Sequence, residues 1–254
     1  MELFRLTFAS IITRKTFAIF AMLLLALPFV LPYMTPWETK PSIIEPARAQ
    51  ASWWMLWVAA ACWLLFQGAN IGDRWASHGI LEYFKTLGKN RVNQMFQIWL
   101  ACFSIFAGMI LITFGISTFT AMPGDPIEAH HWLVTNFQYV LLFLLVTAPL
   151  LLFSIAMGTR FRGAVAYAVT LGLLVHGLFG IRYLEVFLAD NKSPLLNFIY
   201  VVSPHYHLSD LTSRLVFKLG ALPWGEMGNI ALYLAGLGLL TVGFSIQLFK
   251  EVKS

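Results

Sequence analysis

Charged residues are scarce in this sequence. Asp, Glu, Lys and Arg make up 11% of the 254 residues, whereas soluble globular domains carry roughly a quarter. Hydrophobic residues make up 59%, and the mean hydropathy is +0.73. These values exclude an ordinary soluble domain and predict an integral membrane protein.

Several chemical motifs are missing as well. The sequence contains no Gly-x-x-x-x-Gly-Lys-Ser/Thr loop for ATP phosphates and no His-Glu-x-x-His zinc motif. Its long apolar runs hold no Asp or Glu that could couple transport to protons or ions. We therefore expect this chain to be no enzyme and to hold no cofactor and no metal. Any energy source should lie in another protein.

Ionisable and sulfur-containing residues offer little within the apolar runs. Only His176 lies near the middle of a run. Ionisable groups at membrane depth are candidates for a substrate path, and the alternative is a neutral histidine that makes one hydrogen bond between helices. Cys62 and Cys102 lie inside apolar runs, so no extracellular disulfide framework is implied and both are expected to be packing residues.

What the chain does have is long apolar runs, each able to cross a bilayer as a helix of about 20 residues. The runs cover 16–34, 51–69, 95–119, 132–156, 164–182 and 229–249. They are continuously apolar and do not alternate, which is atypical of membrane β-strands. The sequence thus predicts one all-α membrane domain over residues 1–254, with six transmembrane helices.

Aromatic residues gather where two of these runs begin. We expect them to form belts at the outer membrane interface, as Trp and Tyr commonly do. They are Trp53, Trp54 and Trp57 in the second run, and Trp132, Phe137 and Tyr139 in the fourth.

The distribution of charge predicts the orientation. With both termini in the cytoplasm, the cytoplasmic segments hold eleven of the seventeen basic residues, as the positive-inside rule requires. These are Arg5, Arg14, Lys15, Arg74, Lys85, Lys89, Arg91, Arg160, Arg162, Lys250 and Lys253. These basic residues then face anionic lipid, which explains the net charge of +5 without a nucleic-acid partner. We expect a multi-pass protein of the cell (inner) membrane.

Two segments outside the runs carry apolar residues. Residues 1–15 set apolar side chains among a few polar positions, which fits a short amphipathic helix in the inner interface. A cleaved signal peptide is the alternative, but the small-residue stretch "ARAQA" lies too far beyond the first run. Residues 183–228 contain apolar pieces too short to cross, which predicts a partly re-entrant outer segment.

Histidine pairs and glycines complete the candidate list. His205 and His207 are two residues apart, but two ligands do not make a closed metal site, and His130 and His131 belong to another loop. Arg182 and Glu185 are expected to form a local ion pair. Small residues let membrane helices approach closely. Two roles are open for Gly108, Gly115, Gly172, Gly177, Gly236 and Gly243: close approach at interfaces where helices slide, or packing of a static bundle.

The polar stretch 72–91 interrupts the apolar runs on the cytoplasmic side. Ile80, Leu81, Phe84 and Leu87 recur with helical spacing, and glycines at 79 and 88 mark the ends. The pattern predicts a helix of two to three turns with exposed aromatic side chains, which suits docking to another protein. The alternative is an ordinary helix that lies on lipid headgroups.

This stretch resembles the coupling region of type 2 ATP-binding-cassette export permeases. That region often has an acid-Arg pair, then Gly-Thr-Leu-Glu, then a hydrophobic turn that ends in Leu-Pro-x-Ser-Arg. Here the matching segments are Asp73-Arg74, Gly79-Ile80-Leu81-Glu82 and 83–91. Ile80 stands for the threonine and Gly88 for the proline, two extra residues separate Arg74 from Gly79, and no lysine opens the third span near Gln97. "SPHYHLSDLTSRLV" resembles the family's Ser-Pro before a short outer helix.

The resemblance implies a function for the whole chain. It would be the membrane-spanning subunit of an exporter, paired with a second copy or a homologue, and energised by a separate ATPase that binds ATP and Mg²⁺. The implied ATPase interface consists of Asp73, Arg74, Gly79, Leu81, Glu82, Phe84, Lys85, Leu87 and Arg91. A non-transporting scaffold or immunity-type subunit that docks a cytoplasmic partner is the alternative. The transported substrate does not follow from the residues.

Overall fold

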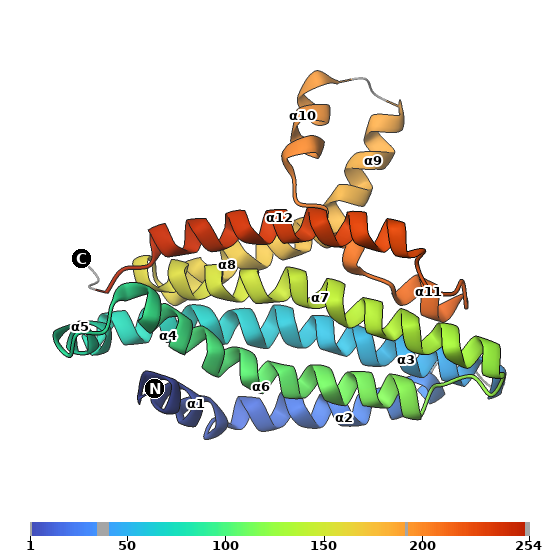
Figure 1. The fold of residues 1–254 in the computed structure, drawn as a ribbon, viewed down its shortest axis with the longest axis horizontal. Coiled ribbons are helices and arrows are strands. Elements are labelled where there is room, and N and C mark those ends of the chain that lie inside the picture. Colours follow the sequence, from blue (N-terminus) through green and yellow to red (C-terminus); the bar gives the residue numbers. More distant parts are fainter. Residues whose placement is uncertain (1, 35–40, 191–192, 252–254) are drawn as a thin grey trace.

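The computed structural model describes residues 2–34, 41–190 and 193–251, and the described chain is all helical, without strands. Six helical units are long and apolar enough to cross a membrane (Figure 1). Four of the units are α2 (Lys15–Met34), α6 (Arg91–Phe119), α7 (Pro126–Arg160) and α12 (Trp224–Leu248). The second unit joins α3 (Pro41–Val58), the π-helical turn η1 (Ala59–Leu64) and α4 (Leu65–Ser77). The fifth joins α8 (Gly163–Val175), the π-helical turn η2 (His176–Gly180) and α9 (Ile181–Asp190).

The predicted all-α membrane fold is therefore confirmed, and the helices that contain the predicted runs are longer than the runs. The second unit continues beyond residue 69 to Ser77, and the fifth continues beyond residue 182 to Asp190 as α9. Polar residues at these ends are accommodated because the helices continue beyond the apolar core. Hydropathy marks the lipid-exposed middle of a helix and leaves its polar ends out.

The two ends of the bundle differ in charge. Helix α1 (Glu2–Ile12), helix α5 (Ile80–Thr86) and Glu251 lie at one end, which we call the basic end (Figure 1). The helices alternate in direction, so this end also holds the α7–α8 turn with Arg160 and Arg162. Ten of the eleven basic residues assigned to the cytoplasm lie there, and the remaining one, Lys253, lies outside the described residues.

Helices α4 and α7 cross in backbone contact. A Cβ atom added to Gly72 would lie 2.2 Å from the carbonyl oxygen of Ile155, and one added to Gly158 would lie 2.2 Å from that of Ala69. Gly68 precedes Gly72 by four residues, which is the Gly-x-x-x-Gly spacing of close helix pairs in membranes. Only glycine fits at this crossing.

The prediction of the packing glycines was largely wrong within this chain. Gly108, Gly172, Gly236 and Gly243 have open space where a Cβ would be, and Gly115 meets only the ring of Phe119. The exception is Gly177, where a Cβ would lie 2.4 Å from the Tyr206 ring. The four open glycines face away from the rest of the fold, and periodicity alone does not reveal which face of an apolar helix is covered.

The predicted outer aromatic belts were also wrong for most of their members. Trp53 and Tyr139 are fully buried and stack with ring centroids 3.9 Å apart. Trp57 and Trp132 are buried too, so that only Trp54 and Phe137 remain exposed. These rings build the protein core at the end opposite to the basic end, because each carries a polar group that finds a hydrogen-bond partner there.

The predicted amphipathic helix at the N-terminus is α1, and it packs on protein. Leu3, Thr7 and Ile11 are buried on one face of α1, which lies against α6. The indole Nε1 of Trp75 donates to the hydroxyl of Thr7 at 3.2 Å. This contact fastens α1 to the end of α4.

The predicted outer segment contains several short helices. After α9 come α10 (Pro194–Val202), the 3₁₀ turn η3 (Tyr206–Ser209) and α11 (Thr212–Val216). Helices α9 and α10 project from the side of the bundle as a hairpin, whereas α11 packs on the end of α3 (Figure 1). The apolar side chains of this hairpin are largely exposed, including Tyr183, Phe187 and Phe198.

Candidate functional site

Helix α5 is set off from its neighbours by two glycine turns at the basic end. Gly79 and Gly88 adopt φ values of 70° and 77°, in the left-handed region that other residues rarely enter. Their positions at the two ends of α5 confirm the predicted helix limits. Asn90 then begins α6, because its side-chain oxygen accepts the backbone N–H of Asn93 at 2.8 Å.

One face of α5 is fixed to the bundle and the other is open. Leu81 and Phe84 are buried, at 0% and 7% exposure, and α5 contacts both α4 and α6. The expected exposure of Phe84 was therefore wrong. The exposed aromatic residue is Tyr83, at 61%, and Glu82 and Leu87 are exposed beside it. The open face thus combines an acid, an aromatic ring and an aliphatic side chain.

The predicted acid-Arg pair lies near the end of α4, about one turn before that helix ends at Ser77. Asp73 accepts the backbone N–H of Gly163 at 2.7 Å and the hydroxyl of Ser77 at 3.0 Å. Its carboxylate therefore sits at the N-terminus of α8, where a helix favours negative charge. Arg74 is exposed. Asp73 thus links two transmembrane units, and only Arg74 of the pair presents its side chain to the exterior.

The C-terminal segment also reaches α5. Lys85 forms an ion pair with Glu251, with Nζ and Oε2 2.9 Å apart, and Gln94 of α6 donates to the same carboxylate at 3.4 Å. Arg91, in the first turn of α6, is exposed. The residues of the predicted ATPase interface therefore fall into two groups, one holding α5 in place and one exposed.

His176 has a structural partner outside its own helix. It is the first residue of η2, and its Nε2 lies 2.9 Å from the hydroxyl oxygen of Ser203. Its side chain therefore joins the fifth transmembrane unit to the segment after α10. His176 does not line the cleft described next, although four of its neighbours do.

An apolar cleft of about 270 Å³ lies between the second and fifth transmembrane units. It is lined by Trp54, Trp57, Val58, Ala61, Cys62, Leu174, Val175, Leu178, Phe179 and Asp210. Both of its helical walls contain a π-helical turn, η1 on one side and η2 on the other. Such turns are rare and occur frequently at functional sites. The cleft is thus a candidate binding site, and Asp210 is its only charged lining residue.

The carboxylate of Asp210 belongs to a network centred on Tyr139. The Tyr139 hydroxyl donates to Asp210 Oδ1 at 2.6 Å and accepts the indole N–H of Trp57 at 2.9 Å. Thr212 donates to the same oxygen through its backbone N–H, at 3.1 Å, and through its hydroxyl, at 2.5 Å. One carboxylate oxygen therefore joins α3, α7 and the start of α11.

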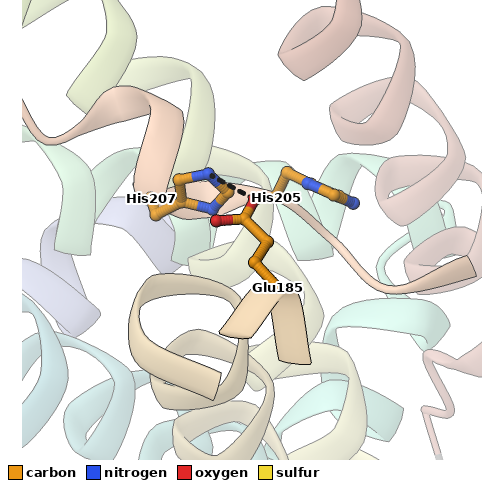
Figure 2. Close-up of side chains that lie close together, drawn as sticks. All are labelled: Glu185, His205 and His207. Atoms are coloured by element: carbon orange, nitrogen blue, oxygen red, sulfur yellow. Dashed lines mark ion pairs between the residues drawn. The ribbon is translucent and has the colours of Figure 1, made fainter. Parts of the chain in front are cut away.

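Glu185, His205 and His207 form a second cluster, at the base of the α9–α10 hairpin. One ligand atom from each residue lies within 4.8 Å of the others. Figure 2 shows the carboxylate of Glu185 and the ring of His207 turned toward each other, with Oε1 and Nε2 3.9 Å apart. Burial lowers the pKa of His207, and the negative charge of Glu185 opposes that shift.

The sequence did not reveal this cluster, and its partners were predicted differently. Glu185 was expected to pair with Arg182, whereas its only ion pair among the described residues is with His207. The hydroxyl of Tyr200 also donates to Glu185 at 3.0 Å. The spacing of the two histidines was the only available signal, because Glu185 is twenty residues upstream of His205.

Comparisons with known proteins add no relative. No protein-family model, no curated protein and no solved structure matches the chain.

Proposed function

We propose that this chain is the membrane-spanning subunit of an ATP-driven ATP-binding-cassette exporter. The observation that carries the proposal is α5, a short helix held between two glycine turns at the basic end, with an open face of Glu82, Tyr83 and Leu87. The six-helix architecture, the helix α1 and the helical outer segment fit the same proposal. By the positive-inside rule the basic end would face the cytoplasm, and both termini would then lie on the cytoplasmic side of the cell membrane.

The partners follow from what the chain does and does not contain. A separate ATPase subunit would bind ATP and Mg²⁺ and dock on α5. A second copy of this chain, or a homologue, would complete the membrane part of the exporter, and lipid would cover the remaining apolar surface. The chain itself would then be no enzyme and would need no nucleic acid.

The contacts of α5 explain how a push from the ATPase would reach the membrane. Leu81 and Phe84 fix α5 to the ends of α4 and α6, so α5 cannot move without them. Helix α4 is locked to α7 by the backbone contact at Gly72 and Gly158, and Asp73 joins α4 to α8. A force on α5 would therefore move the second, third, fourth and fifth transmembrane units together.

The cleft between the second and fifth units is the proposed part of the cargo path. Its lining is apolar except for the carboxylate of Asp210, which suits an amphipathic molecule with a hydrogen-bonding or cationic group. Leu174 and Leu178 on η2 and its flank lie on one wall, and Trp57 lies on the other. His176 would act behind this wall, by holding η2 to Ser203.

The test is to identify the proteins that co-purify with the wild-type chain and with variants of the exposed face of α5. We expect an ATP-binding-cassette ATPase to elute with the tagged wild-type chain in mild detergent, as identified by mass spectrometry. Glu82→Arg and Tyr83→Ala should each reduce the recovered ATPase at least tenfold, because both side chains are exposed on the open face. The variants should elute as the same monodisperse species as the wild type.

Two controls make this test specific. Glu226→Arg makes the same change of charge on an exposed residue at the opposite end, and it should leave ATPase recovery unchanged. Phe84→Ala should instead lower the stability of the chain itself, because Phe84 is buried. Recovery of no nucleotide-binding partner with the wild type would contradict the proposal.

The alternative function is a scaffold or immunity-type subunit that docks a cytoplasmic partner without transport. The same α5 surface would serve it. The two functions differ in the partner recovered and in its response: an exporter subunit should change the ATPase rate of its partner, whereas a scaffold should recover a partner that does not hydrolyse ATP.

A further inference from the structure

We propose that Glu185, His205 and His207 form a binding site for a divalent metal of the zinc class. The site lies in the outer segment, far from α5, and it does not depend on the exporter proposal. Glu185 comes from α9, His207 from η3, and His205 from the residue just before η3. The three side chains thus come close together from two separate parts of the chain, and Figure 2 shows the Glu185 carboxylate between His207 on one side and His205 on the other.

The distances between the three ligand atoms are slightly longer than those in a metal-bound site. The ligand atoms lie within 4.8 Å of one another. In a tetrahedral zinc site with bonds of 2.0–2.1 Å, neighbouring ligand atoms are roughly 3.3 Å apart. Each side chain therefore needs a shift of about one ångström toward the centre. Glu185 can supply much of that movement, because its side chain is 45% exposed.

The hydrogen bond of His205 prepares it as a ligand. Its Nε2 lies 3.0 Å from the backbone carbonyl oxygen of Tyr200. A carbonyl oxygen can only accept a hydrogen bond, so Nε2 must carry the hydrogen. The Nδ1 atom then holds a free lone pair. This arrangement, in which a ring N–H donates to a backbone carbonyl, is the usual orientation of metal-binding histidines.

His207 is oriented from its other side. Its Nε2 faces the carboxylate of Glu185, whereas its Nδ1 is buried and has no hydrogen-bond partner among the described residues. In the tautomer with the hydrogen on Nδ1, the lone pair of Nε2 is available to a metal beside Glu185.

The ligand types select the metal. Two imidazoles and one carboxylate suit zinc and its neighbours, whereas magnesium and calcium prefer oxygen ligands alone. Three protein ligands leave a fourth position open for water or another ligand. The Tyr200 hydroxyl donates to Oε1 of Glu185, which orients the carboxylate as outer groups commonly do in such sites.

A bound metal would join α9 to the segment before α11. The hairpin of α9 and α10 projects from the bundle (Figure 1). His205 also donates its backbone N–H to the hydroxyl of Tyr233 on α12, at 3.1 Å. The metal would therefore tie the hairpin to the sixth transmembrane unit through a single residue.

The experiment measures metal binding by the whole chain. The protein is purified in detergent without a histidine tag, stripped with chelator and titrated with Zn²⁺ by calorimetry. We expect one Zn²⁺ per chain, no comparable binding of Mg²⁺, and at least tenfold weaker Zn²⁺ binding in Glu185→Gln and His205→Gln. The control His130→Gln changes an exposed histidine near the start of α7 and should bind like the wild type.

A second measurement covers variants that fail to fold. Co²⁺ bound to the wild type should give the intense visible bands of four-coordinate cobalt, and Zn²⁺ should remove them. Absence of saturable Zn²⁺ binding, absence of these bands, or equal binding in the ligand variants and the wild type would overturn the proposal.

Discussion

The α4–α7 crossing near the basic end and the Tyr139 network near the opposite end are both buried, but different interactions hold them. At the crossing, backbone meets backbone, and glycine at 72 and 158 is the condition for contact. In the network, large aromatic side chains meet, and their polar groups bond to one another and to Asp210. The crossing depends on the absence of side chains at two glycines, whereas the Tyr139 network depends on hydrogen bonds between large side chains.

The difference bears on what each region can do. A crossing of two backbones leaves little room for adjustment, so it holds α4 and α7 together as one body. The network consists of side-chain hydrogen bonds that connect α3, α7 and the start of α11. Asp210 also lines the apolar cleft. The cleft is therefore bounded in part by this network.

The largest expected effect comes from filling the crossing. Gly158→Leu would put a side chain where even a Cβ lies 2.2 Å from the carbonyl oxygen of Ala69. Overpacking ordinarily costs about 1–3 kcal/mol, and more where the obstacle is backbone that cannot yield. We expect the variant to lose the monodisperse peak of the wild type in size-exclusion chromatography.

The matched control for this change is Gly108→Leu. Gly108 has open space at the position of a Cβ, so the same substitution should leave the elution profile unchanged. Normal elution of Gly158→Leu would show that α4 and α7 do not cross in backbone contact.

A smaller effect is expected from breaking the network. Tyr139→Phe removes the hydroxyl that accepts from Trp57 and donates to Asp210. The indole N–H then stays buried without its partner, which costs about 1–3 kcal/mol. For a chain of this size we expect the unfolding temperature to fall by about 2–12 °C, measured by tryptophan fluorescence in detergent.

Tyr183→Phe serves as the control for the loss of a tyrosine hydroxyl. Tyr183 is 69% exposed on α9, so the Tyr183→Phe variant should unfold at the same temperature as the wild type. Equal temperatures for Tyr139→Phe and Tyr183→Phe would mean that the network adds no stability.

The sequence predicted which helices form better than it predicted which residues those helices bury against one another. The number of transmembrane helices followed from the length of the apolar runs, and the limits of α5 followed from Gly79 and Gly88. The buried positions of Trp53 and Tyr139 did not follow, because an aromatic residue near a helix end suits an interface and a core equally. Only the fold shows that Asn136 accepts the indole N–H of Trp53 at 3.0 Å.

The candidate sites show the same limit. Periodicity placed Leu81 and Phe84 on one stripe of α5, but it did not show that this stripe faces the bundle and that Tyr83 is the exposed ring. The third ligand of the histidine cluster, Glu185, lies on another helix. Long-range pairs of this kind depend on how the helices pack, which a single sequence does not record.

The smallest expected effect comes from the ion pair between Lys85 and Glu251, and it tests whether charge helps to hold α5 in place. Glu251→Gln keeps the shape of the side chain and an oxygen that can accept from Gln94, but it removes the charge that faces Lys85. The lysine side chain is 59% exposed, so solvent screens the pair and its loss should cost less than about 1 kcal/mol. Hydrogen exchange of the α5 amides should be nearly the same in wild type and Glu251→Gln, because Leu81 and Phe84 hold α5. A large loss of protection would mean that the C-terminal segment, and not the buried face of α5, fixes the helix.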